Sequence, residues 1–153
     1  MSGRHFEDIL AETGTLCYTN VGVSMLPLIR EGRDVIVIKR RTEARLKKYD
    51  VVLFKRPGVS GRGTYVLHRV LKVKPNGTYW IVGDNCTSGE TVREENVIGV
   101  LTDVVRGGRS LTDGIGYWLY VHTWAACWPV RFLLLRLYGS VKRLLRHFKC
   151  MGK

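Results

Sequence analysis

The stretch YVLHRVLKVKPNGTYWIV, residues 65–82, decides the fold of this chain. It holds two runs that are rich in Val, Leu, Ile and aromatic residues, and β-branched and aromatic residues are typical of β-strands. The letters KPNG between the two runs supply Pro, Asn and Gly, which favour tight turns. Residues 65–73 and 78–82 are therefore predicted to form an antiparallel hairpin.

Similar short runs lie on both sides of this hairpin, separated by turns rich in Gly, Pro and Asp. They are VIVIK (35–39), VVLFK (51–55) and VIGVLTDVV (97–105). Because no segment of helical period separates these runs, we expect a mainly β fold, a compact antiparallel sheet or barrel. Residues 5–12 are predicted to form a short helix ahead of it.

The charge of the chain is strongly positive and unevenly distributed. The 153 residues, enough for one modest core, include 25 Lys and Arg against 13 Asp and Glu, a net charge of +12. No acidic residue follows Asp113, so the last forty residues carry +7 and residues 1–113 carry +5. This distribution points to a polyanionic partner for the tail, either a membrane surface or a nucleic acid.

The tail itself, residues 111–153, has two parts. Residues 117–130 are apolar and contain Trp118, Trp124 and Trp128, and residues 131–149 are predicted to form a cationic amphipathic helix. At 100° per residue its basic side chains fall within an arc of roughly 160°, opposite a leucine-rich face. The basic positions are Arg131, Arg136, Lys142, Arg143, Arg146, His147 and Lys149.

Two interpretations of this helix stay open. It could pack its apolar face on the sheet, or lie on an anionic membrane with its tryptophans at headgroup depth, and we favour the second for residues 117–149. A membrane-spanning helix is not expected, because the charge-free run 114–130 has 17 residues and a span needs about 20.

The cysteines and the N-terminus bear on the compartment. Cys17, Cys86, Cys127 and Cys150 are scattered, without a C-x-x-C pair or a His at ligand spacing. Their number would allow two disulfides, but the first twenty residues lack the basic and apolar regions of a secretory signal. We therefore expect reduced thiols in the cytoplasm, and neither a metal nor another cofactor.

Three residues could carry out chemistry: Ser24 in GVSMLP (22–27), His68 in the predicted hairpin, and Asp84 in VGDN (82–85). Each has a structural interpretation as well. Ser24 fits an ordinary turn, His68 fits a satisfied core position on a mostly apolar strand face, and Asp84 fits a turn in which it caps its own backbone. Taken singly, the three residues do not settle a function.

Taken together, GVSMLPLIREGRDVIVI, KKYDVVLFKRP, YVLHRVLKV and WIVGDN resemble, in the same order, the boxes of the type I signal peptidase family. The resemblance covers roughly residues 20–105. It implies a β catalytic domain of signal-peptidase type over residues 1–110. Ser24 would be the nucleophile and His68 the general base, as in the endoplasmic-reticulum-like subclass, whereas bacterial members usually have Lys.

The same resemblance implies that Asp84 supports the site. Some relatives use a second acid shortly after their GDN box, and Glu90 is the candidate here, so which carboxylate orients His68 stays open. The chemistry is consistent with a His base, because imidazole has an unperturbed pKa near 6.5 and is neutral at cytosolic pH. A neutral His can accept the serine proton once a partner fixes its tautomer.

The chain departs from the family pattern at several positions. Arg33 is an extra residue before Asp34, Tyr49 stands in place of Gly, and Gly22 supplies no hydroxyl for an oxyanion hole, which leaves backbone N–H donors. Family members normally carry an N-terminal membrane anchor, whereas this chain opens on a polar segment. We therefore expect a serine endopeptidase that is peripheral on the inner face of the membrane and removes a leader or signal segment from a peptide.

Two other functions are weaker alternatives. A self-cleaving regulator of the related repressor type would add a helix-turn-helix domain and use Lys as its base. A non-catalytic β-module could be tethered to a membrane or to nucleic acid by the basic tail. Nucleic acid is the less favoured partner, because binding to single strands interleaves aromatic with basic residues, and here the two kinds lie on opposite faces.

Overall fold

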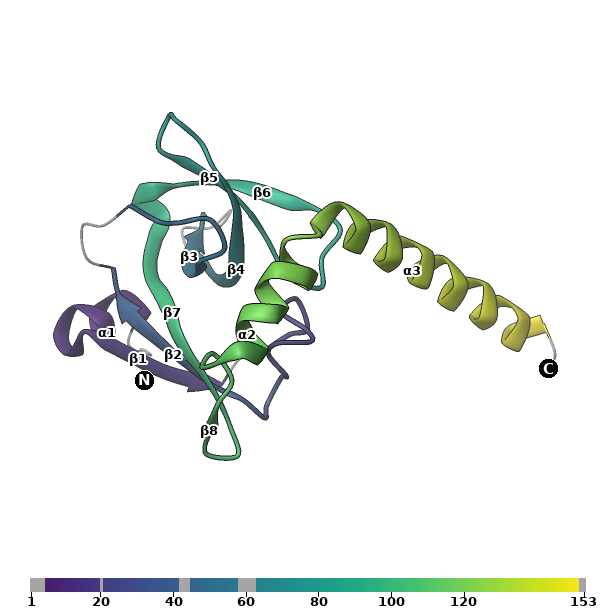
Figure 1. Cartoon of the computed structure of the whole chain (residues 1–153), viewed down its shortest axis with the longest axis horizontal. Coiled ribbons are helices and arrows are strands. Elements are labelled where there is room, and N and C mark those ends of the chain that lie inside the picture. Colours follow the sequence, from purple (N-terminus) through teal and green to yellow (C-terminus); the bar gives the residue numbers. More distant parts are fainter. Residues whose placement is uncertain (1–4, 20, 42–44, 58–62, 152–153) are drawn as a thin grey trace.

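A computed structural model describes residues 5–19, 21–41, 45–57 and 63–151, with side chains described as far as residue 143. The chain forms one antiparallel sheet with a helical segment at its C-terminal end (Figure 1). The elements are α1 (Phe6–Thr13), β1 (Thr15–Thr19), β2 (Val35–Arg40), β3 (Val51–Arg56), β4 (Thr64–Val73), β5 (Thr78–Val82), β6 (Gly89–Arg93), η1 (Glu94–Asn96), β7 (Val97–Arg106), β8 (Arg109–Ser110), α2 (Ile115–Tyr120), η2 (Val121–Ala125) and α3 (Trp128–Met151).

The predicted hairpin is confirmed: β4 and β5 pair antiparallel, with Arg69 opposite Val82 and Val73 opposite Tyr79. The sheet order is β1-β2-β7-β3-β4-β5-β6, and β8 pairs with β7. The helix expected over residues 5–12 is confirmed as α1, which ends at Gly14 with φ of 72°. Glycine adopts this left-handed conformation without steric cost, which explains the residue at the helix end.

The sheet is curved, but it is not closed into a barrel, so the barrel alternative was wrong. Among the described residues, β1 pairs only with β2 and β6 only with β5. Closure depends on strand tilt and on the stagger of the hydrogen-bond register, and neither quantity can be read from hydrophobic periodicity.

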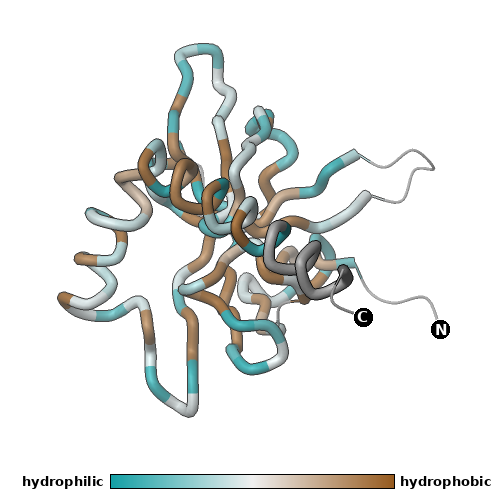
Figure 2. Tube along the Cα trace, turned by 90° about the vertical axis from the view of Figure 1, so that its right-hand side faces the viewer, coloured by the Kyte–Doolittle hydropathy of each residue, from teal (hydrophilic) through white to brown (hydrophobic). Residues whose placement is uncertain are grey.

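Apolar side chains are buried on both faces of the sheet. One cluster gathers Leu10 of α1, Met25 and Leu67, and the other gathers Phe54 and Val70. Strand β4 is buried on both faces from Leu67 to Leu71, so its polar residues at positions 68 and 69 lie inside the protein. Figure 2 shows hydrophobic positions recurring along the strands of the sheet.

The C-terminal segment is helical over more residues than predicted. Helix α3 begins at Trp128 rather than at residue 131, and α2 and the π-helical η2 precede it. Pro129 lies in the first turn of α3, where the backbone N–H groups have no partner within the helix, so proline is tolerated there. Within the described chain, none of the helices is both long and apolar enough to cross a membrane.

Candidate functional site

The loop between β1 and β2 carries Ser24 and is held by its neighbours. Met25 and Ile29 are fully buried in the core, while Val23 is exposed and Ser24 is half-buried. Gly22 has φ of 106°, a conformation that side-chain-bearing residues rarely adopt. The alternation of anchored and exposed positions presents Ser24 at the surface on a fixed backbone.

The loop after β5 contacts this serine loop directly. The backbone N–H of Asn85 donates to the carbonyl oxygen of Ser24 at 2.8 Å, and its side-chain amide donates to the carbonyl of Val23 at 3.1 Å. These hydrogen bonds join the GVSMLP and VGDN stretches, which are about sixty residues apart in the sequence.

His68 lies at the same junction. A Cβ atom placed on Gly83 would lie 2.7 Å from the carbonyl oxygen of Ser24 and 3.0 Å from Nε2 of His68. The two atoms therefore lie within about 6 Å of each other, the sum of those distances. Only glycine fits at position 83, because any larger residue would press on both groups. The structure thus brings the backbone carbonyl of Ser24 and the ring of His68 together at Gly83.

Two polar groups of Ser24 are uncommitted. Within the described part of the chain, neither its hydroxyl nor its backbone N–H forms a hydrogen bond. A serine hydroxyl can attack a carbonyl once a base takes its proton, and a backbone N–H can donate to the oxyanion that forms.

The environment of His68 favours a neutral ring. Its side chain is 11% exposed, and burial lowers its pKa, while the nearby Glu90 carboxylate opposes that shift. Its Nδ1 atom lies 3.8 Å from Oε1 of Glu90, and within the described residues it has no hydrogen-bond partner. Arg56 holds Glu90 through two contacts, Nε to Oε2 at 2.9 Å and a terminal nitrogen to Oε1 at 2.5 Å.

Asp84 faces the other side of the sheet, where it binds Arg69. Both side chains are fully buried. The Arg69 guanidinium donates to Asp84 at 2.9, 3.1 and 2.7 Å, and the Tyr120 hydroxyl donates to Asp84 at 2.8 Å. Among the described residues, Glu90 has the only carboxylate within 4.0 Å of the His68 ring, and the carboxylate of Asp84 is engaged by Arg69.

Sequence reasoning missed Arg69, although a signal was present. Alternation along the strand puts Arg69 between Leu67 and Leu71 on one face, and an arginine on a buried apolar face needs a carboxylate as its partner. Burial by itself would lower the pKa of Arg69, but the charge and hydrogen bonds of Asp84 outweigh it and raise that pKa. Arg69 therefore stays charged inside the protein.

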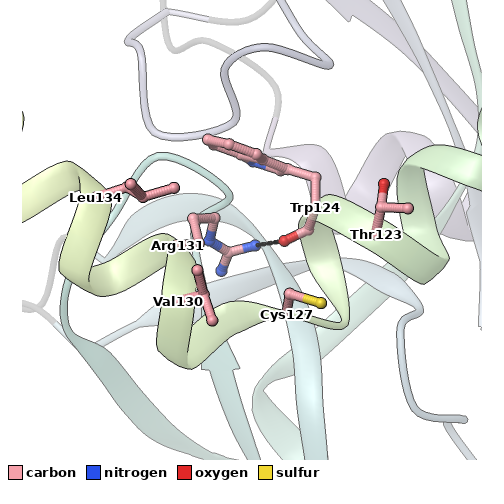
Figure 3. Close-up of a pocket in the computed structure, with 6 residues that line it drawn as sticks. All are labelled: Thr123, Trp124, Cys127, Val130, Arg131 and Leu134. Atoms are coloured by element: carbon pink, nitrogen blue, oxygen red, sulfur yellow. Dashed lines mark hydrogen bonds between the residues drawn. The ribbon is translucent and has the colours of Figure 1, made fainter.

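The helical segment covers this ion pair. Nε1 of Trp124 donates to the carbonyl of Asp84 at 3.2 Å, and Arg131 lies 3.7 Å from an Asp84 carboxylate oxygen. Arg131 is 1% exposed and donates to the carbonyl of Trp124 at 3.1 Å (Figure 3). The prediction that grouped Arg131 with the other basic side chains of the amphipathic helix was wrong about its surroundings, because its guanidinium is buried beside the Asp84 carboxylate.

These contacts cross the boundary drawn between residues 1–110 and 111–153. Tyr120, Trp124 and Arg131 all reach the loop that carries Asp84. The first part of the tail therefore packs on the sheet, beside the candidate site. Sequence periodicity located the helix but carried no information on these partners.

No group of three His, Cys, Asp or Glu residues in the described ranges is arranged to bind a metal ion. Cys17, Cys86 and Cys127 are free thiols, and burial raises the pKa of Cys86.

We compared the chain with family models, with curated proteins and with solved structures, and it matches none of them.

Proposed function

We propose that this protein is a serine endopeptidase of signal-peptidase type that cleaves a leader or signal segment from a peptide. The observation that carries the proposal is the junction at Gly83, where the backbone of Ser24 and Nε2 of His68 meet. The hydrogen bonds from Asn85 to the serine loop keep that junction in place. The sequence resemblance described above points to the same two residues.

The proposed reaction uses the neutral form of His68. Nε2 takes the proton of the Ser24 hydroxyl as the oxygen attacks the peptide carbonyl, and the Ser24 N–H donates to the resulting oxyanion. The protonated His68 then gives its proton to the leaving amine, which yields an acyl-enzyme. Water, deprotonated by the same ring, releases the acid and regenerates Ser24.

We further propose that Glu90 orients the His68 ring. Its carboxylate lies on the Nδ1 side, where it favours the tautomer that keeps the proton on Nδ1 and leaves Nε2 free to accept. Arg56 fixes the position of Glu90. Asp84 acts at a greater remove, because its hydrogen bonds go to Arg69 and Tyr120.

The substrate would bind in an extended conformation. Strand β6, which carries Glu90, pairs only with β5 among the described residues, so its outer edge offers backbone groups close to His68. A peptide could add there as a further strand. By the resemblance, small side chains are expected next to the cleaved bond.

The pH dependence of cleavage follows from the lowered pKa of His68. Only the neutral ring can act as the base, so kcat/KM should fall in acid with an apparent pKa below 6.5, the unperturbed value. Glu90→Gln removes the charge that raises this pKa, and the acid limb should move to still lower pH. A pH–rate profile of both proteins measures this, and an unmoved limb would exclude Glu90 as the neighbour of the titrating group.

The function itself is tested by terminal proteomics. The purified protein is incubated with a library of leader-like peptides, and new N-termini are compared with those produced by Ser24→Ala and His68→Ala. Termini that arise only with the unmodified protein support the proposal and report the cleavage preference. Identical termini from all three proteins would exclude Ser24 and His68 as the catalytic residues.

A further inference from the structure

Helix α3 exposes a continuous apolar stripe. Its members recur at spacings of three and four residues, fall within an arc of about 140° on the helix, and are 52–65% exposed. They are Val130, Leu133, Leu134, Leu137, Tyr138 and Val141. A stripe of this width would normally be buried, so it is a candidate interaction surface.

The stripe is not the side by which α3 packs on the sheet. Trp128 and Phe132 contact Trp80 of β5, with ring centroids 4.9 and 6.4 Å apart, and Arg131 on the same side of the helix is buried. Beyond this root, α3 projects away from the sheet (Figure 1). The interpretation that the tail packs on the sheet therefore applies only to the first turns of α3, around Trp128 and Phe132, and the apolar stripe stays exposed.

The tryptophans are distributed differently from the expectation. Trp124 and Trp128 are half-buried and belong to the body of the protein, through Asp84 and Trp80 respectively. Trp118 in α2 is 53% exposed and lies next to exposed Leu119. Only Trp118 among these three is free enough to reach another surface.

The stripe continues into a groove at the elbow between η2 and α3. This groove, of about 300 Å³, is lined by stripe residues Val130 and Leu134 and by Thr123, Trp124, Cys127 and Arg131 (Figure 3). The apolar surface therefore runs from the exposed helix to a point beside Trp124, which contacts the loop of Asp84.

The opposite face of α3 is basic. Three exposed basic residues lie within an arc of about 120° centred opposite the stripe: Arg136, Lys142 and Arg143. In the sequence, residues 114–153 include no Asp or Glu. A partner of α3 must therefore accept both an apolar stripe and an uncompensated positive charge.

We propose that α3 docks on an anionic lipid bilayer, with the stripe in the interfacial region and the basic side chains on the lipid headgroups. Both properties are then used, because acyl chains cover the stripe and the long basic side chains reach phosphate groups at its flanks. A second copy of the helix would cover the stripe but bring like charges together. A nucleic acid would neutralise the charge but leave the stripe in water.

Vesicle sedimentation tests this docking with the full chain, independently of any peptidase activity. Vesicles of phosphatidylglycerol mixed with phosphatidylcholine are compared with vesicles of phosphatidylcholine alone, at low and high salt. The triple variant Leu133→Gln/Leu137→Gln/Val141→Gln should weaken binding to the anionic vesicles by about tenfold or more, because each of the three side chains would otherwise bury apolar surface in the bilayer. These residues are exposed, so the far-ultraviolet circular dichroism should be unchanged.

A charge-removal pair completes the design. Arg136→Gln/Lys142→Gln/Arg143→Gln should weaken binding at low salt by roughly ten- to a hundredfold, since a basic residue near an anionic surface is worth about 1 kcal/mol. The matched control Arg30→Gln/Arg33→Gln/Lys39→Gln removes the same charge from exposed positions on the body, and should bind like the unmodified protein.

Several outcomes would overturn the proposal. Equal binding to neutral and anionic vesicles would show that the charge of α3 has no role in docking. The same conclusion would follow if the control variant weakened vesicle binding as much as the α3 variant does. The protein could instead fail to bind vesicles and form a concentration-dependent dimer that Leu133→Gln/Leu137→Gln/Val141→Gln dissociates. That result would assign the stripe to a second copy of the chain. The protein could also fail to bind vesicles but bind DNA, with that binding lost in Arg136→Gln/Lys142→Gln/Arg143→Gln and kept in the control. That result would assign the tail to nucleic acid.

Discussion

Replacing Ser24 by alanine is expected to lower kcat/KM for leader-peptide cleavage by at least about 10⁴-fold, because the covalent route then has no nucleophile. The neighbouring Met25 and Ile29 still anchor the loop, so the variant should fold with unchanged stability. Cleavage rates are measured with a peptide identified by its new terminus. The matched control is Ser88→Ala, at an exposed position close to the site in the sequence, which should keep its full rate.

A double variant separates catalysis from general damage. His68→Ala should cost about as much as Ser24→Ala, and Ser24→Ala/His68→Ala should be no slower than either single variant, because residues that act as one unit have non-additive effects. Multiplying losses would instead show that the two residues act independently. A Ser24→Ala protein that keeps a tenth or more of the rate would contradict the assignment of the nucleophile.

The second large effect concerns the buried ion pair. Asp84→Ala leaves the Arg69 guanidinium without its carboxylate in a fully buried position, and this should lower the free energy of unfolding by about 3–5 kcal/mol. A domain of this size has only about 5–15 kcal/mol of stability in total. Chemical denaturation followed by circular dichroism measures the loss.

The control for this prediction is Glu95→Ala, which removes an exposed ion pair with Arg93 and should change stability by less than about 1 kcal/mol. The double variant Arg69→Met/Asp84→Leu should recover most of the loss, since replacing both members of a buried pair by apolar residues is often neutral. An Asp84→Ala loss no larger than that of the control would mean that the pair is not buried in solution.

The same double variant distinguishes the two candidate orienting carboxylates. If Glu90 orients His68, the folded Arg69→Met/Asp84→Leu protein should keep measurable cleavage, with its acid limb still below 6.5. If that protein is folded and inactive while Glu90→Gln is active, Asp84 holds the ring and the assignment of Glu90 is wrong.

Local patterns predicted much of the fold. The runs at 35–39, 51–55, 65–73, 78–82 and 97–105 became strands, and the helix at the N-terminus formed as α1. The edge strands β1 and β6 were not predicted. Strand β6, with the sequence GETVR, has weak strand propensity of its own and forms through its pairing with β5.

Tyr49 shows a further limit of sequence reasoning. It occupies the position where the resembling family has Gly, and its φ is 77°, a conformation that costs a side-chain-bearing residue free energy. The sequence shows only that Tyr replaces Gly, whereas the structure shows that the residue keeps a positive φ. The carbonyl of Tyr49 accepts a hydrogen bond from Arg69 at 2.9 Å, so the strained residue also supports the buried ion pair.

The sequence by itself determined the five strands over the predicted runs, the amphipathic helix, its charge and the three short stretches that carry Ser24, His68 and Asp84, because these depend on residues that are near neighbours in the chain. Only the tertiary structure decided that Glu90 lies beside the His68 ring, that Arg69 engages Asp84, and that Arg131 is buried while the apolar stripe is exposed. The physical reason is that a buried charge takes its partner from whichever segment the fold brings within reach, and that choice is made by packing across the sheet.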